Sequence, residues 1–560
     1  MPTSDSTDSP FHVEEFSDDE LAIVHRYFTN ADLPVFGITG LPEVVKGALF
    51  ARYSRSPKSV RRLFLDEFAV EPTLGVETIA SHDDGSGPVG LERAEQLYDR
   101  VFTQYGDDSV AQLGGAHLAV EQASNILTKV LEWGRLASYL EQSTRYIFYD
   151  KKLGDRFRYH VPSELHTAGM ADRYRTEMDE TFSTYSTVVG KLVSYYESMH
   201  PKQDGDSDFV WRSTIRAKAC DDARGLLPAA TTSNVGIFGS GQAYEALLLR
   251  MQAHPLDEVR WFGDLMLTEL RKMIPSFMKR VDVPDRGGVW ARYFSDIAES
   301  MDDVAASIHA VPNAAPTVTL VEFDPEGERK VAAAALYAHT NLPDAQIRHL
   351  VDAMSEQEID DVFNAYVGTR TNRRHKPGRS MEQTYYRFDV LCDYGIFRDL
   401  QRHRMMTLEW QALSPDHGYI TPPAIDDISA TGTWDDAMEK AGTLYRDISA
   451  VVSPAVGQYA VPFAQNIRFT MNMNAREAFH MLELRTQQGG HPDYRRVCQQ
   501  MHQLIRDQAG HRRIADAMTF VDHATYDLAR LETERRAAAK RAELGIADPT
   551  MDPVTAPEES

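Results

Sequence analysis

The stretch Asp399–Tyr419, DLQRHRMMTLEWQALSPDHGY, places three consecutive basic side chains, Arg402, His403 and Arg404, directly before an apolar run. Three adjacent cations repel one another, so either water solvates them or an anion holds them together. In an arbitrary sequence, a solvated face or a helix end is the more common explanation. The rest of the chain has to decide between these two interpretations.

The overall composition limits the classes of protein and partner. At 560 residues the chain is too long for one compact core, and its 42% of hydrophobic residues indicates a substantial globular interior. The net charge of −24 disfavours a polyanionic partner, so we expect no nucleic-acid polymer to bind. A local basic cluster in such a chain would instead suit a small anionic ligand.

Cysteine usage and hydropathy indicate a reducing, aqueous compartment. Cys220, Cys392 and Cys498 are far apart and form no Cys-x-x-Cys motif, which disfavours a disulfide framework or a thiolate metal site. The opening residues MPTSDSTDSPFHVEEFSDDE are polar and acidic, unlike a signal peptide. The uncharged stretches contain Pro, His and Asn and are unsuited to crossing a bilayer. We therefore expect a cytoplasmic protein with no membrane partner.

Hydrophobic periodicity predicts a helix-rich first half and a strand where the second half begins. Apolar spacing predicts helices at Glu92–Gln104, His117–Tyr139 and Tyr174–His200, the last ending before a proline. The β-branched run TVTLVEF at 317–323 predicts a strand, followed by a helix in VAAAALYA. The segment RLETERRAAAKRAELG near the end predicts an exposed charged helix.

Two parts of the chain repeat one another. LLP at 226–228 precedes YEALLLRMQAHPLDEVR, and AVP at 460–462 precedes EAFHMLELRTQQGGHPDYRR. Each second segment is an apolar helical stripe that ends in Leu-Arg and is followed by His-Pro and another arginine. This pattern predicts a tandem duplication with copies at 1–300 and 317–535, joined by a linker at 301–316 and followed by a charged tail at 536–560.

Both halves resemble the flavin-dependent thymidylate synthase family, whose signature is RHR-x-x-S-x-N-E-x-S-x-R-Y. The second half keeps the Arg-His-Arg, has Thr407 in place of the first serine, and does not keep the later positions of the signature. The first half has Trp133 and Gly134 in place of the leading Arg-His. It keeps the other conserved positions as Arg135, Ser138, Glu141, Ser143, Arg145 and Tyr146.

The same complementarity continues downstream. The family's A-R-x-x-L-P segment is intact around Arg224 in the first half, whereas Gln458 stands in its place in the second. The family's Asn-Ala-Arg is intact at Asn474–Arg476, whereas the first half has Gly239 and Gly241 there. The resemblance implies an α+β protein of two tandem copies, each helix-rich around a mostly antiparallel sheet. It also implies that the two halves have divided the ligand contacts between them.

The resemblance implies reductive methylation of dUMP to dTMP, with FAD as cofactor and NADPH and methylenetetrahydrofolate as co-substrates. The alternative is a diverged flavin- or nucleotide-binding protein with another substrate or no catalysis. Subunits of the family form tetramers, so we expect a homodimer of this chain that forms a pseudo-tetramer. The implied flavin contacts are Arg402, His403, Arg404, Glu382, Asn474, Arg476 and His480; the implied nucleotide contacts are Glu141, Ser143, Arg145, Arg224, Arg250 and Arg485; the implied catalytic residues are Arg404, Glu141 and Ser143.

Three further signals qualify this interpretation. The basic run RTNRRHKPGR at 370–379 predicts a loop at a pocket rim that attracts cofactor phosphates, in preference to an RNA-binding loop. Two Glu-x-x-His pairs, Glu197/His200 and Glu477/His480, match part of a di-iron pattern, but the family resemblance already explains the second pair, and we expect no metal. Finally, Asp399 replaces a glutamine of the family, and a carboxylate there would repel a phosphate.

Overall fold

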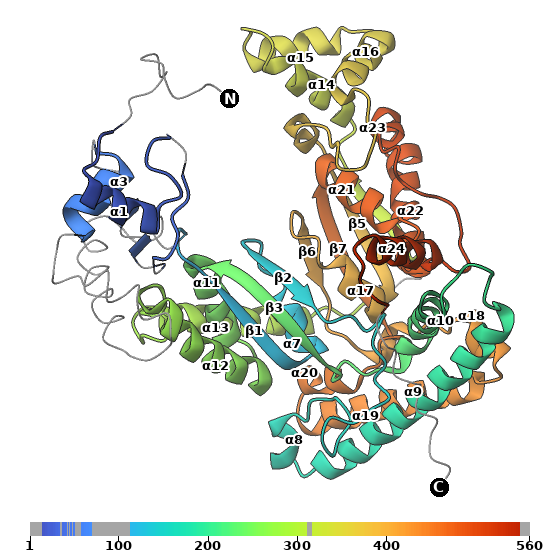
Figure 1. The fold of residues 1–560 in the computed structure, drawn as a ribbon. Coiled ribbons are helices and arrows are strands. Elements are labelled where there is room, and N and C mark those ends of the chain that lie inside the picture. The colour runs from blue at the N-terminus through green and yellow to red at the C-terminus, as the bar shows by residue number, and fades with distance from the viewer. Residues whose placement is uncertain are drawn as a thin grey trace. The chain divides into compact units, whose positions relative to one another are not determined.

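The computed structural model describes residues 14–33, 36–41, 43, 45–46, 49–50, 58–69, 112–310 and 316–548 (Figure 1). The helix predicted at Glu92–Gln104 lies outside these residues. The chain forms two compact units. The first unit contains the residues up to Val120 together with Leu136–Leu140 and Gly236–Ile308, and the second contains Glu121–Arg135, Glu141–Val235 and the residues from His309 onward.

Helices dominate both units. Those of the first unit are α1 (Asp18–Tyr27), α3 (Val60–Leu63), η1 (Phe64–Ala69), α11 (Gly241–Gln252), α12 (Asp257–Met273), η3 (Pro275–Met278) and α13 (Gly287–Ala306). Those of the second are α7 (Asn125–Leu131), α8 (Ser163–Thr167), α9 (Ala171–Met199), α10 (Asp208–Ala223), η2 (Arg224–Leu226), α14 (Gly327–Tyr337), α15 (Asp344–Asp352), α16 (Glu356–Val367), η4 (Arg379–Gln383), α17 (Tyr394–Leu400), η5 (Pro415–His417), α18 (Pro423–Asp427), α19 (Thr431–Val451), α20 (Pro454–Gly457), η6 (Gln458–Ala460), α21 (Ala475–Arg485), α22 (Pro492–Asp507), α23 (Arg512–Ala517) and α24 (Leu531–Glu543).

Several expectations for individual elements are confirmed. The long helix predicted near residues 174–200 is α9, and the predicted strand near 317–323 is β4 (Val318–Phe323), followed by α14. The predicted charged helix near the end is α24, which has no buried residue. Helix α13 continues to Ala306 and so extends into the segment predicted as a linker. None of the helices in the described ranges combines the length and apolar character that a bilayer span requires.

The helix predicted at His117–Tyr139 is wrong. The segment forms strand β1 (Gly115–Ser124), the short helix α7, and strand β2 (Ala137–Glu141). The Ser124 side chain accepts a hydrogen bond from the Leu127 backbone and starts α7 where the strand ends. Only the middle of the segment is therefore helical, and the predicted helix extends too far in both directions. With β3 (Thr232–Ser240) these strands form a sheet in the order β1-β3-β2.

The second sheet is antiparallel, as predicted, and has the order β4-β5-β7-β6. Its central strands, β5 (Tyr385–Asp393) and β7 (Asn466–Asn474), pair along their whole length from Tyr385↔Asn474 to Asp393↔Asn466. Strand β6 (Thr407–Trp410) pairs with β7 at the other edge. Alternate side chains of β5 and β7 are buried, which is the pattern of strands packed on a core. The fold is therefore α+β, as the sequence predicted.

The two halves repeat the same order of elements. In the first half β1, α7 and β2 are followed by α9, the turn η2, and then β3 and α11. In the second half β5, α17 and β6 are followed by α19, the turn η6, and then β7 and α21. Arg224 begins η2 and Gln458 begins η6, as the correspondence of these two residues in the sequence predicts.

Within the second unit the Leu-Pro turn of the first repeat pairs with the Val-Pro turn of the second. Pro228 and Pro462 form an antiparallel bridge, flanked by hydrogen bonds of 2.8 Å from Ala229 N to Val461 O and from Phe463 N to Leu227 O. Helices α9 and α19, one from each repeat, lie side by side (Figure 1). This pairing brings residues that precede each turn close to elements of the other repeat.

Candidate functional site

A buried carboxylate from the first repeat is held by cations from both repeats. Glu141 ends β2, and its Oε1 accepts a hydrogen bond of 2.8 Å from Arg398 Nη2. Its Oε2 accepts a hydrogen bond from Arg402 and one of 3.4 Å from Lys129 Nζ. Lys129 also donates to Glu132 at 2.7 Å. A predicted nucleotide contact, Glu141, is thus bonded directly to a predicted flavin contact, Arg402.

Helix α17 and the turn that follows it carry the two arginines. The Asp393 side chain accepts a hydrogen bond from Ile396 N at 3.0 Å and caps this helix. Arg398 lies in α17, and Arg402 is four residues further along, just beyond the helix end. Sequence reasoning identified Arg402 but missed Arg398. Its spacing from Arg402 is the signal that could have revealed it, because residues four apart face the same side of a helix.

Electrostatics keep Glu141 ionised. Burial alone would raise the pKa of its carboxyl group, but the positive charges of Arg398, Lys129 and Arg402 hold that pKa well below its usual value. The carboxylate is therefore negative at neutral pH and balances part of the positive charge around it.

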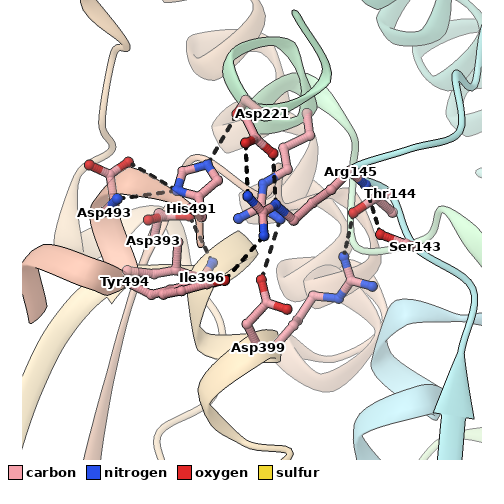
Figure 2. A network of polar contacts seen from close by, with 12 residues as sticks. Ser143, Thr144, Arg145, Asp221, Asp393, Ile396, Asp399, His491, Asp493 and Tyr494 are labelled. Atoms are coloured by element: carbon pink, nitrogen blue, oxygen red, sulfur yellow. Dashed lines mark hydrogen bonds and ion pairs between the residues drawn. The ribbon is translucent and has the colours of Figure 1, made fainter. Parts of the chain in front are cut away.

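Arg145 is held in a second network (Figure 2). Its Nε and Nη2 donate to the two oxygens of Asp221 at 2.7 and 2.9 Å, and its Nη1 donates to Tyr494 Oη at 3.2 Å. Arg530 donates to the same Asp221 carboxylate at 3.2 Å. Burial raises the pKa of Asp221, but Arg145 and Arg530 outweigh this effect and lower it far below the usual range. Arg145 is thus neutralised within the protein.

Asp399 lies between two other arginines. Its Oδ2 is 3.6 Å from Arg224 Nη1, and its Oδ1 is 3.8 Å from Arg402 Nη1. Burial opposes ionisation of Asp399, but the positive charges of Arg402, Arg224, Arg145 and Arg485 lower its pKa below the usual range. Asp399 is therefore an ionised carboxylate beside arginines from both repeats.

His403 is buried and neutral. Its Nε2 accepts a hydrogen bond of 2.9 Å from Arg485 Nε, so the ring proton must be on Nδ1, which donates to Glu477 Oε1 at 3.1 Å. Burial lowers the pKa of His403 to about 4. Glu477 also accepts from His480 Nδ1 at 3.3 Å, and these hydrogen bonds, against the effect of burial, lower its pKa to about 2.

His403, Glu477 and His480 lie close enough to ligate a metal ion. A metal on His403 Nδ1 would require the ring proton to move to Nε2, where Arg485 already donates a hydrogen bond. The arrangement in the structure therefore favours a hydrogen-bonded cluster that positions Arg485.

The buried histidine predicts a specific pH dependence of stability. The His403 pKa falls from its usual 6.5 to about 4 on folding, so the unfolded chain binds more protons between these values. The free energy of unfolding should therefore decrease as pH falls from 6.5 to 4. In His403→Gln, urea titrations across this range should show a slope smaller by up to about 1.4 kcal/mol per pH unit. An unchanged slope would contradict a neutral, buried His403, and exposed His339→Gln is the matched control.

The remaining predicted residues occupy different environments. Arg404 donates to Arg135 O at 3.4 Å, and Ser143 Oγ accepts from Arg145 N at 3.2 Å. The Asn474 side chain caps α21, as Ser240 caps α11 in the first repeat. Arg250 belongs to the first unit, where burial lowers its pKa to about 10.

Glu382 and Arg476 form a more accessible group in the second unit. Arg379 binds the Glu382 carboxylate with three contacts of 3.0–3.1 Å, and Arg476 Nη1 lies 3.6 Å from the same carboxylate. The side chain of Arg379 is 84% exposed and that of Arg476 is 42% exposed. These side chains can be reached by a ligand from solvent.

Two copies of one α+β repeat, with their arginines and carboxylates interleaved in a buried cluster, define a tandem-repeat protein whose polar site is built from both copies. The profile of the family described as thymidylate synthase complementing protein matches residues 62–276 and 319–509, together more than half of the chain. The chain belongs to this family and contains its domain twice.

The chain is similar to two relatives over nearly their whole length and to a third over a shorter segment. The UPF0159 protein of Chlamydia pneumoniae is 37% identical over 529 residues, covering 93% of this chain and 98% of the relative. The UPF0159 protein Ta1429 of Thermoplasma acidophilum is 29% identical over 88% of this chain and 99% of the relative. A flavin-dependent thymidylate synthase of Clostridium tetani is 27% identical over 202 residues, covering 34% of this chain and 76% of the relative.

Proposed function

We propose that this protein is a flavin-dependent enzyme that methylates dUMP to dTMP at a site shared by its two repeats. The observation that carries the proposal is the direct contact of Glu141, from the first repeat, with Arg398 and Arg402, from the second. Family membership and the flavin-dependent relative support the reaction type. Methylenetetrahydrofolate would donate the carbon, and NADPH would supply reducing equivalents. We further propose that the chain acts as a homodimer.

The chain offers a residue set that fits FAD. Arg404, Arg476 and His480 are partly accessible, and their basic side chains suit the pyrophosphate of a dinucleotide. The reduced flavin, when bound, would supply the hydride for the transferred carbon. Arg402 and Arg398 would orient Glu141, while buried His403 would hold Arg485 in place through its Nε2. Rate enhancement in such a site depends on positioned charges and needs no cysteine or serine nucleophile.

A second candidate function is binding of a flavin or nucleotide without this reaction. The observation that favours it is the internal neutralisation of Arg145 by Asp221, which leaves less positive charge for a nucleotide phosphate. Bound flavin without methylation would support this alternative.

Growth of a thymidine-requiring bacterium tests the proposed function. The protein, expressed in a strain without its own thymidylate synthase, should restore growth without thymidine. Arg404→Ala and Arg224→Ala should each abolish growth, because each removes a guanidinium from the shared site. Arg446→Ala, an exposed arginine of α19, is the matched control and should grow normally.

Two outcomes would contradict the proposal. Failure of the folded, expressed wild-type protein to restore growth would exclude dUMP methylation, and flavin absorbance of the purified protein would then test the binding alternative. If growth survives Arg404→Ala at an equal protein level, Arg404 of the second repeat is not part of the site.

A further inference from the structure

Two buried N–H groups, one from each of the arginines beside Asp399, have no hydrogen-bond partner in the described part of the chain. Arg224 is only 3% exposed, and its Nη2 makes no hydrogen bond there. The Nε of Arg402 is also buried and has no partner among the described residues. A buried N–H without an acceptor is costly, so donors of this kind favour a ligand that brings an anionic oxygen.

Asp399 already faces both of these arginines. It lies 3.6 Å from Arg224 Nη1 and 3.8 Å from Arg402 Nη1, longer than good hydrogen bonds. Other carboxylates bind the surrounding guanidinium groups more closely, since Arg145 binds Asp221 and both Arg398 and the Nη2 of Arg402 bind Glu141. Asp399 is therefore held less closely than Asp221 and Glu141, and it lies beside the guanidinium of Arg224, whose Nη2 has no acceptor among the described residues.

We propose that Asp399 is a specificity-determining residue that competes with the phosphate of the ligand for Arg224 and Arg402. A carboxylate and a doubly charged phosphate beside the same two arginines repel each other at low dielectric. The subsite therefore binds a doubly charged phosphate monoester more weakly than a singly charged ester of the same nucleoside. This inference rests on the proposed function only for the identity of the nucleoside.

Calorimetry on the full chain tests the proposal with inorganic phosphate, deoxyuridine, dUMP and the methyl phosphate ester of dUMP as probes. Asp399→Asn and Asp399→Ser should each bind phosphate and dUMP at least about tenfold more tightly than the wild type, or about 1.4 kcal/mol. The affinity for deoxyuridine should not change, and the preference for the methyl ester should disappear. Arg224→Gln should lose the phosphate affinity.

Asp416→Asn is the matched control, because it removes the same charge from an exposed position. It should bind every probe as the wild type does. Binding should also be read from the rise in Tm with phosphate, which reports a folded site even in a less stable variant. Unchanged or weaker phosphate binding in both Asp399 variants, or an equal gain in Asp416→Asn, would overturn the proposal.

The same experiment separates this inference from the proposed function. Tighter phosphate binding in Asp399→Asn, in a protein that neither binds nor methylates dUMP, would support the inference and exclude the function. Methylation of dUMP by the wild type, without any gain in the Asp399 variants, would support the function and exclude the inference.

Discussion

Replacing Glu141 with alanine should lower the free energy of unfolding by about 3–5 kcal/mol, because it leaves buried cations without their carboxylate. Arg398 and Lys129 have side chains that are only 4% and 3% exposed, so water cannot replace the lost charge. Urea unfolding at neutral pH measures the loss. Activity should also disappear, since Arg398 and Arg402 would no longer be held together.

Two further variants test whether the loss in Glu141→Ala comes from burial and from the unpaired cations. Glu409→Ala, at an exposed position of β6, should change stability by less than about 0.5 kcal/mol. Adding Arg398→Met to Glu141→Ala should recover part of the stability, because it removes one of the uncompensated charges. A loss below about 1 kcal/mol in Glu141→Ala would show that the cations are solvated and that this cluster does not join the repeats.

The Glu141 carboxylate also predicts a loss of stability in acid. Its pKa is lower in the folded chain than in the unfolded chain, so its contribution is present above the usual value of 4.5 and is lost as pH falls further. Glu141→Gln should therefore lose stability at neutral pH and show a weaker decline below pH 4.5 than the wild type.

Replacing Trp434 with alanine should destabilise the protein by about 3–5 kcal/mol through loss of the contact between the repeats. Trp434 in α19 is fully buried, and its Nε1 donates to Ile420 O at 3.2 Å. It packs against Gly225 of the other repeat so closely that a Cβ at position 225 would lie 2.6 Å from the indole ring. Thermal or urea unfolding measures this effect.

Trp261→Ala is the matched control, because that tryptophan is 58% exposed. It should change stability by no more than about 0.5 kcal/mol. Gly225→Ala should be destabilising, because its new methyl group would meet the Trp434 ring and Ala464. Equal effects of the two tryptophan replacements would contradict the tight packing of the repeats.

The sequence predicted the elements whose signal is local. Helix α9 has a continuous apolar stripe that ends before a proline, and β4 is a β-branched run bounded by a turn. The apolar spacing at 117–139 wrongly predicted one long helix, because two strands flank a helix of only seven residues, α7, in this segment. Short elements contain too few residues for the helical and strand periods to be distinguished.

The candidate site was predictable only in part. Motif order selected Glu141, Arg145, Arg224 and Arg402, and the structure places all four in the second unit. Their partners were missed, since Asp221 and Arg398 belong to no motif: Asp221 is recognised only by its tertiary contact with Arg145, and Arg398 only by its contact with Glu141 of the other repeat.

The sequence by itself determined that this chain is a duplicated member of its family, because repeat spacing and motif residues are linear properties, and the α+β fold followed from that resemblance. Only the tertiary structure decided which charges neutralise each other. His403 proved to be a buried neutral group, and Asp399 proved to face Arg224 and Arg402. Charge pairing depends on distance and burial in three dimensions, and residues more than a hundred positions apart along the chain reach those distances only when the repeats pack together.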